Sequence, residues 1–477
     1  MGIGVICMVN RTVQGSVENT RDNQSATNIQ GCALPESSQQ DYGGTLPWSA
    51  SDQSWLFSGL GWGALLSVFP AGWLADRHGV KYLWLLCSAL HLIGTLLTPV
   101  AADYGVAATV AARFIVGMGK GMQLPVAMSW LTRWYPKYER ASVIGLYSSG
   151  NQLASILGNP LSAFHCQAGV FGGWPAVFYL TAPFVAPTML LWLVFVTDDP
   201  QDNRFLSRSE KAFLLREVGS GSRKMNAKAD TRATPWKDIC TSWPVLAILV
   251  NNVTTACTFV LVQSYLPTYF KEALLLDLQK NGLLSALPFA AQIATKMTSA
   301  PIADRLNRGP KNSSRATVIC RVMNSLANFP AGLFMILLVL TDCTNPGLAI
   351  LLVTAAMSAA GLWVPGFFAS AASVAPAYSG IIGSLSFLFA QLSAALFPYA
   401  VGALTTHGTV EEWRWPWVIV GTLLLLTGAL FLAFGSGQEQ SWATKAANDS
   451  TKKLDSAVTE VAAIATSTTE KQRGYAR

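Results

Sequence analysis

The chain has 477 residues, of which 51% are hydrophobic and only 12% are charged, and its formal net charge is +7. That charged share is about half of what soluble domains carry, so the composition excludes a disordered chain and argues against a soluble globular protein. Eight cysteines in a chain of this length also exclude a disulfide-rich scaffold.

Apolar stretches that are long enough to cross a bilayer recur along most of the chain. A hydrocarbon core of about 30 Å needs about 20 such residues in a helix, so the sequence predicts an all-α membrane protein. We predict eleven full spans, at residues 54–74, 80–101, 106–131, 141–164, 175–196, 244–266, 282–303, 316–340, 347–369, 380–403 and 415–436.

The first thirteen residues are apolar but too few to span a membrane, and they contain Arg11. They lack the charged leader and the small-residue cleavage site of a signal peptide. We interpret them as the outer end of a first span that is truncated. A twelve-span design would then give about eleven full spans in this chain.

Lys and Arg are distributed unequally between the two sides that these spans define. One side, which includes residues 197–243 and 437–477, carries 24 of the 33 Lys and Arg, whereas the other side carries five. The positive-inside rule makes the richer side cytoplasmic, so the linker and the C-terminus are predicted to be cytoplasmic. The positive net charge therefore needs no nucleic-acid partner to explain it.

The polar segment 14–52 lies on the opposite, outer side in this topology. Asn23 stands there in the glycosylation sequence Asn-Gln-Ser, well clear of the membrane, although an unused sequence of this kind is the alternative. Cys32, Cys166 and Cys343 are the three cysteines expected on this side. Their positions allow a Cys32–Cys343 bridge in an extracellular or lumenal compartment, and the other cysteines are predicted to be inert.

The charged linker 197–243 divides the spans into an N-terminal half, residues 1–196, and a six-helix C-terminal half, residues 244–436. We expect the linker and the Ser/Thr/Lys/Glu-rich tail 437–477 to be mobile.

A repeated motif supports this division. It follows the second span of the first half as Gly72-Trp-Leu-Ala-Asp76-Arg77-His-Gly79-Val-Lys81, and that of the second half as Ala300-Pro-Ile-Ala-Asp304-Arg305-Leu-Asn-Arg308-Gly309. Two parallel halves with a substrate path between them are a known transporter architecture. Charge pairs at these helix ends could latch the halves together. An ordinary charged loop is the alternative, but the doubling favours a latch.

The first motif resembles the signature loop of the major facilitator superfamily, and Arg113-Phe-Ile-Val-Gly117-Met-Gly-Lys-Gly121 resembles its fourth-helix motif. Further segments across residues 48–443 resemble the family of sialin, the vesicular glutamate and nucleotide transporters and the sodium/phosphate cotransporters. Leu266-Pro-Thr-Tyr269 and Gly435-Ser-Gly-Gln-Glu-Gln-Ser-Trp442-Ala are most like sialin. The resemblance implies the major facilitator fold with two six-helix halves, and transport of organic anions or phosphate.

Apart from Lys81 at the edge of span 80–101, four cations but no Asp or Glu fall inside the predicted spans, namely Arg113, Lys120, Lys296 and Arg321. An ionisable group in a span is costly and is a functional candidate by default. Because these cations lack carboxylate partners within the spans, an anionic substrate is their natural counter-ion.

Arg113 and Lys120 are seven residues apart and share one helix face with Gly117. The forked guanidinium suits a carboxylate or phosphate, and the resemblance implies that the matching Arg lines the anion path. Relatives carry Glu where Lys120 stands, in association with proton coupling. Three alternatives follow for Lys120: altered coupling, a second anion contact or passive transport. Glutamate is disfavoured as the substrate, because Thr255 and Phe57 replace an Arg and a His of the glutamate carriers.

Other polar residues inside the spans admit two interpretations. Asn151 and Gln152 could hydrogen-bond substrate or could hold helices together. Lys296 lies eight residues before Asp304, about 12 Å along a helix, and we slightly prefer that its side chain reaches toward the cytoplasm. Arg321 is expected to reach the membrane surface.

The sequence contains no phosphate-binding glycine loop, no metal-ligand cluster and no nucleophile elbow. We therefore expect no enzyme, no cofactor and no metal. The energy source is expected to be an ion gradient, with proton or sodium as the coupling ion, or the substrate's own gradient. The main hypothesis is a secondary carrier of small organic anions by alternating access. The alternatives are a sodium- or potential-driven phosphate or anion carrier, and a non-transporting receptor-like relative. A monomer suffices, in a plasma, lysosomal or vesicular membrane.

Overall fold

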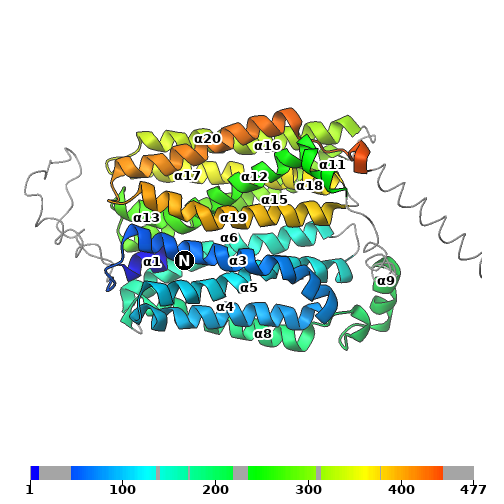
Figure 1. Cartoon of the computed structure of the whole chain (residues 1–477), viewed down its shortest axis with the longest axis horizontal. Helices are drawn as coiled ribbons and strands as arrows, with labels where there is room; N and C mark the ends of the chain where they lie inside the picture. Colours follow the sequence, from blue (N-terminus) through cyan, green and yellow to red (C-terminus); the bar gives the residue numbers. More distant parts are fainter. Residues whose placement is uncertain are drawn as a thin grey trace, which may run out of the picture.

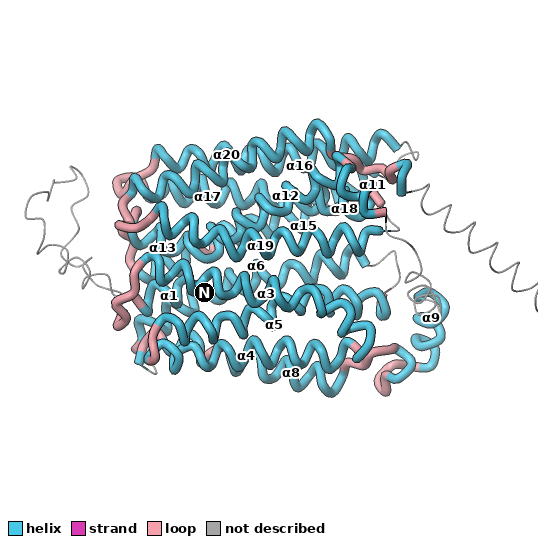
Figure 2. Tube along the Cα trace, viewed as in Figure 1, coloured by secondary structure: helices cyan, strands magenta, loops and turns pink. Residues whose placement is uncertain are grey.

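The computed structural model describes residues 2–9, 44–135, 140–169, 172–218, 235–307, 313–375 and 378–443. Nearly all of these residues form helices (Figure 2). Within these ranges no β-strand forms, and the only strand-like contact is an isolated bridge between Val9 and Leu46. The predicted all-α membrane fold is therefore confirmed.

The N-terminal half consists of the helices up to residue 195. They are α1 (Gly2–Met8), α3 (Ala50–His78), α4 (Val80–Asp103), α5 (Val106–Trp134), α6 (Arg140–Ala168), α7 (Pro175–Tyr179) and α8 (Ala182–Phe195).

The C-terminal half consists of the helices from residue 236 onward. They are α11 (Trp236–Thr241), α12 (Trp243–Val260), η4 (Leu261–Tyr265), α13 (Leu266–Glu272), α14 (Leu278–Leu284), α15 (Leu287–Asn307), α16 (Ser313–Leu337), α17 (Pro346–Ala360), η6 (Gly361–Trp363), η7 (Val364–Phe368), α18 (Ala369–Ser373), α19 (Ser379–Leu404) and α20 (Val410–Phe434).

The long helices run roughly parallel, with the C-terminal half above the N-terminal half in the view of Figure 1. Contacts between the halves are made by α3 with α19 and by α6 with α14 and α15. We call the end of the bundle where α1 and α13 lie the α1 end. The opposite end, where α9 (Arg208–Val218), α11 and α18 lie, is the α9 end.

By length and composition, seven helices or joined helices of the described residues could cross a membrane. They are residues 80–103, 175–195, 243–272, 315–340, 346–373, 380–404 and 410–434. The other four predicted spans coincide with α3, α5, α6 and α15, which are long helices with more polar side chains. Helices of that kind would be expected where a transmembrane bundle encloses a polar path.

Several predicted continuous spans are interrupted: the one at 282–303 is shared by α14 and α15, and two others are divided as follows. The span predicted at 175–196 is divided into α7 and α8. The span predicted at 347–369 changes from α17 through a 3₁₀ turn to a π-helical turn, where Gly366 has non-helical backbone angles (φ −84°, ψ −113°). Pro365 precedes this residue, and a proline removes one helical hydrogen bond. Hydropathy alone does not register such breaks.

The linker contains helix α9, although we expected a mobile segment. Ser207 and Glu210 form a reciprocal cap at its start: the Ser207 N–H donates to Glu210 Oε2 (3.0 Å) and the Glu210 N–H donates to Ser207 Oγ (3.2 Å). The bond from the Ser207 N–H also lowers the pKa of Glu210. Residues 219–234 of the linker and 444–477 of the tail lie outside the described residues.

The predicted roles of the cysteines need one correction. Cys7, which we expected to be inert, forms a disulfide with Cys166 and joins α1 to α6. Because α1 is buried over its whole length, Cys7 is held against α6 in the fold, 159 residues along the chain. Cys343 is also disulfide-bonded. Cys32 lies outside the described residues, so its proposed pairing with Cys343 stays a prediction.

Candidate functional site

Helix α5 carries Arg113 and Lys120 and packs closely on α3. A Cβ added to Gly117 would collide with the backbone of Leu60, and one added to Gly121 would collide with that of Ala64. The spaced glycines of the fourth-helix motif therefore allow two backbones to touch. This close contact fixes the helix face that carries the two cations.

The side chain of Arg113 is only 2% exposed. Its Nε and Nη2 atoms have no hydrogen-bond partner among the described residues. Its guanidinium carbon lies 4.8 Å from the centre of the Phe178 ring on α7, which is a cation–π distance. An aromatic face offers some stabilisation but accepts none of the directed N–H bonds, so the fork is chemically suited to hold a carboxylate or phosphate.

Lys120 is two turns further along α5, with an exposed side chain. Arg113 is about 10 Å from the start of α5 and Lys120 about 21 Å, so Lys120 is at the middle of the helix. The two cations thus present positive charge over about 10 Å of one helix face.

A series of polar contacts, which we call the α6 ladder, joins α6 of the N-terminal half to η4, α14 and α15 of the C-terminal half. Its bonds are Lys296 Nζ to Ser148 Oγ, Gln152 Nε2 to Gln292 Oε1 (3.2 Å), Gln263 Nε2 to Asn151 Oδ1 (3.0 Å) and to Ser155 Oγ (3.2 Å), and Asn159 Nδ2 to the Ser285 carbonyl (3.4 Å). Asn151 and Gln152 therefore both bond across the two halves, which is the second of their two predicted interpretations.

Lys296 differs from our expectation. It is 5% exposed and its ammonium donates to Ser148 on the opposite half, so the ammonium is buried between the halves and does not extend into solvent. The prediction considered only the distance along α15, whereas the neighbouring α6 supplies a nearer acceptor. Of the charged side chains whose burial the structure describes, only Arg113 and Lys296 are buried, and no carboxylate is among them.

The repeated motif lies at the α9 end. Gly79 adopts a positive φ of 85°, which favours glycine, and the Asp198 carboxylate packs against it. Asp198 Oδ1 accepts from the backbone N–H groups of Val80 and Lys81, the latter at 2.9 Å, and thereby caps the start of α4. Sequence reasoning missed Asp198, although an acidic residue directly after an apolar span was a usable signal.

The other predicted members of this motif can be placed only in part. Gly72, Asp76 and Arg77 belong to α3, and Asp304 and Arg305 to α15. Arg305 is exposed, whereas the side-chain surroundings of the other four lie outside what the structure describes. Arg133 Nη2 donates to the carbonyl of Ala75 (3.4 Å), which ties the end of α5 to that of α3.

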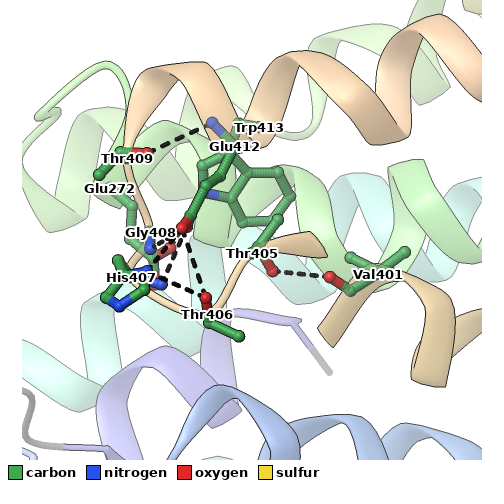
Figure 3. A network of polar contacts seen from close by, with 9 residues as sticks. All are labelled: Glu272, Val401, Thr405, Thr406, His407, Gly408, Thr409, Glu412 and Trp413. Atoms are coloured by element: carbon green, nitrogen blue, oxygen red, sulfur yellow. Dashed lines mark hydrogen bonds and ion pairs between the residues drawn. The ribbon is translucent and has the colours of Figure 1, made fainter. Parts of the chain in front are cut away.

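The α1 end of the C-terminal half is closed by a different network, around the loop between α19 and α20 (Figure 3). Glu412 accepts from the backbone N–H groups of His407 and Gly408, both at 2.9 Å, and its Oε1 is 2.7 Å from His407 Nδ1. Trp413 Nε1 donates to Glu272 at 3.0 Å and joins α20 to α13. These contacts fix a loop and a helix start, so we regard them as structural.

The interior of the C-terminal half contains a buried amide cluster on α12, α16 and α20. Asn251 donates to Asn324 (3.1 Å), and Asn328 donates to Asn251 (3.0 Å) and to Thr427 (3.4 Å). Trp363 Nε1 donates to Asn328 at 2.7 Å. One amide nitrogen, Asn324 Nδ2, has no partner among the described residues. We name this group the C-half amide cluster.

The remaining predicted residues are explained simply or stay untested. Arg321 donates through Nε to the Gly435 carbonyl (2.7 Å) and through Nη2 to the Ala433 carbonyl (3.0 Å), so it binds the C-terminal end of α20. Asn23 lies outside the described residues, and its glycosylation stays a prediction. Of the described residues, no three His, Cys, Asp or Glu side chains gather into a candidate metal site.

A family model described as "Major Facilitator Superfamily" matches residues 23–398. Among curated proteins, the chain is 30% identical over 405 residues to "Uncharacterized transporter slc-17.3" of Caenorhabditis elegans, which covers 84% of this chain and 74% of that protein. It is 29% identical over 396 residues to human "Sialin", with 83% and 78% covered. It is 28% identical over 400 residues to "Vesicular glutamate transporter 1" of Xenopus tropicalis, with 83% and 67% covered.

Among solved structures, the inward open conformation of the xylose transporter XylE from E. coli superimposes with a TM-score of 0.63. The match covers 91% of this chain and 93% of that chain at 13% sequence identity. An identity this low carries information about the fold alone. The structural match agrees with the division of the helices into two groups and with the predicted architecture of two halves.

Proposed function

The chain belongs to the Major Facilitator Superfamily, within its sialin and vesicular glutamate transporter branch, and from this premise we propose that it is a secondary active transporter of small organic anions. It is a multi-pass membrane protein from a family of transporters, not of enzymes. Transport would proceed by alternating access, in which the two halves move relative to each other around a central substrate.

The observation that carries the proposal is the guanidinium of Arg113. It is buried, two of its N–H-bearing nitrogens have no described partner, and its closest described aromatic contact is the Phe178 ring. A buried charge is stable only when it is paired and hydrogen-bonded. An oxyanion with two acceptor atoms meets both needs, and the planar fork matches a carboxylate or phosphate in a bidentate way.

Lys120 extends this positive face and serves as a second candidate for substrate binding or coupling. Asn151 and Gln152 are candidates of another kind, because their present bonds cross between the halves. In alternating access such bonds break and form again in each cycle. The same two amides could then bond a substrate in one state and the opposite half in another.

The motif at the α9 end is proposed to latch the halves in one state of the cycle. Its candidate members are Gly72, Asp76, Arg77, Gly79, Asp304 and Arg305. The Asp198 cap on α4 supports this role, because it gives the first copy of the loop a defined conformation.

The coupling ion is proposed to be a proton or sodium. Among the residues whose side chains the structure describes, which do not include Asp76 and Asp304, no carboxylate is buried, so no acidic proton carrier is found in that part of the interior. This favours, as a second candidate, a sodium- or potential-driven carrier of phosphate or another anion. A receptor-like relative without transport is the third candidate.

We propose that the α9 end faces the cytoplasm, since the excess of Lys and Arg lies on that side. The name of one relative, a vesicular glutamate transporter, favours a vesicular membrane, and a lysosomal or plasma membrane is the alternative. Each monomer would carry one small anion at a time. The protein would lie in a lipid bilayer and would need no nucleic-acid partner.

Uptake into vesicles reconstituted with the full chain tests the proposal. The probes are inorganic phosphate, lactate, glutamate and a sialic acid, with proton, sodium and potential gradients imposed one at a time. We expect saturable uptake of at least one probe, driven by one of the three gradients. The absence of saturable uptake of every probe, in a preparation that is folded and correctly inserted, would overturn the function.

A further inference from the structure

The burial of the Lys296 ammonium group is not explained by anion recognition at Arg113. Its ammonium group is almost fully buried, and its one described hydrogen bond is to the neutral hydroxyl of Ser148. An ammonium has three N–H donors and no acceptor. A buried ion without an opposite charge is energetically costly, so the position of Lys296 suits an additional oxyanion.

One turn away along each helix, a second contact between α6 and α15 also leaves a buried polar atom without a described partner, in this case a hydrogen-bond acceptor. Gln152 is one turn from Ser148 on α6 and donates to Gln292, which is one turn from Lys296 on α15. The other amide atom, Gln152 Oε1, is buried and has no partner among the described residues. The two turns therefore offer unused donors on Lys296 and an unused acceptor on Gln152, which an anion that also carries an O–H or N–H donor could bond together.

The place of this pair in the α6 ladder is also distinctive. Of the ladder bonds described above, Lys296 to Ser148 is the one nearest to the α9 end, because Ser148 precedes the other α6 members in a helix that starts there. The backbone of α15 at Lys296 packs closely against η6. A Cβ added to Gly361 of η6 would lie 3.0 Å from the backbone nitrogen of Lys296. This packing fixes the backbone of α15 at Lys296, so a change of partner would be a rotation of the Lys296 side chain.

We propose that Lys296 is a second anion contact, on the opposite half from Arg113, and that a carboxylate or phosphate oxyanion replaces the Ser148 hydroxyl on its ammonium group. The exchange removes the ladder bond nearest to the α9 end when the anion arrives. Anion binding and the parting of α6 from α15 are thereby linked. This inference rests on the proposed function, because the same transported anion would make both contacts.

Two variants separate an anion contact from a purely structural bond. Lys296→Gln removes the charge but retains a hydrogen-bond donor, and Ser148→Ala removes only the present partner. We measure the KM for the probe anion that the unmodified protein takes up best, from the four named above. We expect Lys296→Gln to raise the KM about tenfold or more, as for the loss of one charge-assisted bond. Ser148→Ala should lower the KM or leave it within about twofold, because the ammonium loses a competing partner.

Other outcomes of the same KM measurements would contradict the proposal. A KM unchanged in Lys296→Gln, or raised equally by both variants, overturns the inference and makes the pair a structural bond. If Lys296→Gln does not fold, Lys296→Arg and Ser148→Ala decide, and a raised KM in Ser148→Ala contradicts the exchange. Failure of the proposed function looks different, since the unmodified protein would then take up none of the probes.

Discussion

The C-half amide cluster and the surroundings of Arg113 differ in how their buried polar groups are satisfied. In the C-terminal half, Asn251, Asn328 and Trp363 are neutral and bond to one another inside the C-half amide cluster. In the N-terminal half, the guanidinium of Arg113 is buried with two nitrogens unpartnered among the described residues. Neutral groups that pair internally hold helices together, whereas a buried charge without a partner is prepared for a ligand.

The largest effect is expected from Arg113, on transport. Arg113→Gln should reduce saturable anion uptake at least about tenfold, because a hydrogen-bonded charge pair worth about 1.5–3 kcal/mol is lost. Arg113→Lys should also be impaired, since a point charge cannot reproduce the fork. Uptake into reconstituted vesicles is the measurement, with the amount of inserted protein as the control. Normal uptake by Arg113→Gln would leave the function resting on resemblance alone.

The matching change in the C-terminal half should affect stability. Asn328→Leu leaves the indole N–H of Trp363 and the side-chain amide oxygen of Asn251 without their described partner, at a cost of about 1–3 kcal/mol. We expect a lower midpoint of thermal unfolding in detergent and an unchanged KM in the molecules that remain folded. Arg113→Gln is the paired control, and its midpoint should be unchanged or higher, because it removes a buried charge. A reversal of the two patterns would contradict the division between the halves.

Lys120→Glu sharpens the assignment within the N-terminal half. A carboxylate two turns from Arg113 on the same face would compete with the substrate, so we expect uptake to fall several-fold. Uptake should be compared at several pH values, with Lys120→Gln as the neutral control. Increased dependence on a proton gradient in Lys120→Glu would instead assign this position to coupling.

A change remote from both interiors provides the smallest effect. Asn23→Gln should alter neither uptake nor thermal stability, but it should remove the mobility shift that glycosidase treatment causes in the unmodified protein. The readout is electrophoresis of protein from a glycosylating host. If the unmodified protein shows no shift, Asn23 is an unused sequence and the outer location of residues 14–52 loses this support.

Much of the helical framework could be predicted from the sequence, because apolar length is a local property. The predicted span 80–101 matches α4 closely, and 380–403 matches α19. The break at Gly366 was missed, since its cause is backbone geometry and not hydropathy. Pro365 directly before Gly366 was the available signal.

One feature of the candidate site, the lack of a carboxylate partner for Arg113, could be predicted from the sequence. The lack of acidic residues in the spans already indicated that Arg113 has no carboxylate partner. Contacts between distant segments were not predictable: the Lys296 bond to Ser148 and the Cys7–Cys166 disulfide each require knowledge of which helices are neighbours. The same applies to the cap that Asp198 places on α4.

The central claim, that Arg113 holds the charge of a small anion, is tested most directly by competition between charged and neutral isosteres. Uptake of the best probe carboxylate is measured in vesicles while the same acid or its primary amide is added. The account predicts that the acid competes and the amide does not. In Arg113→Gln, any residual uptake should show a weaker preference, because Lys296 and Lys120 are the other proposed contacts for the charge. Equal competition by acid and amide in the unmodified protein would contradict charge recognition at Arg113.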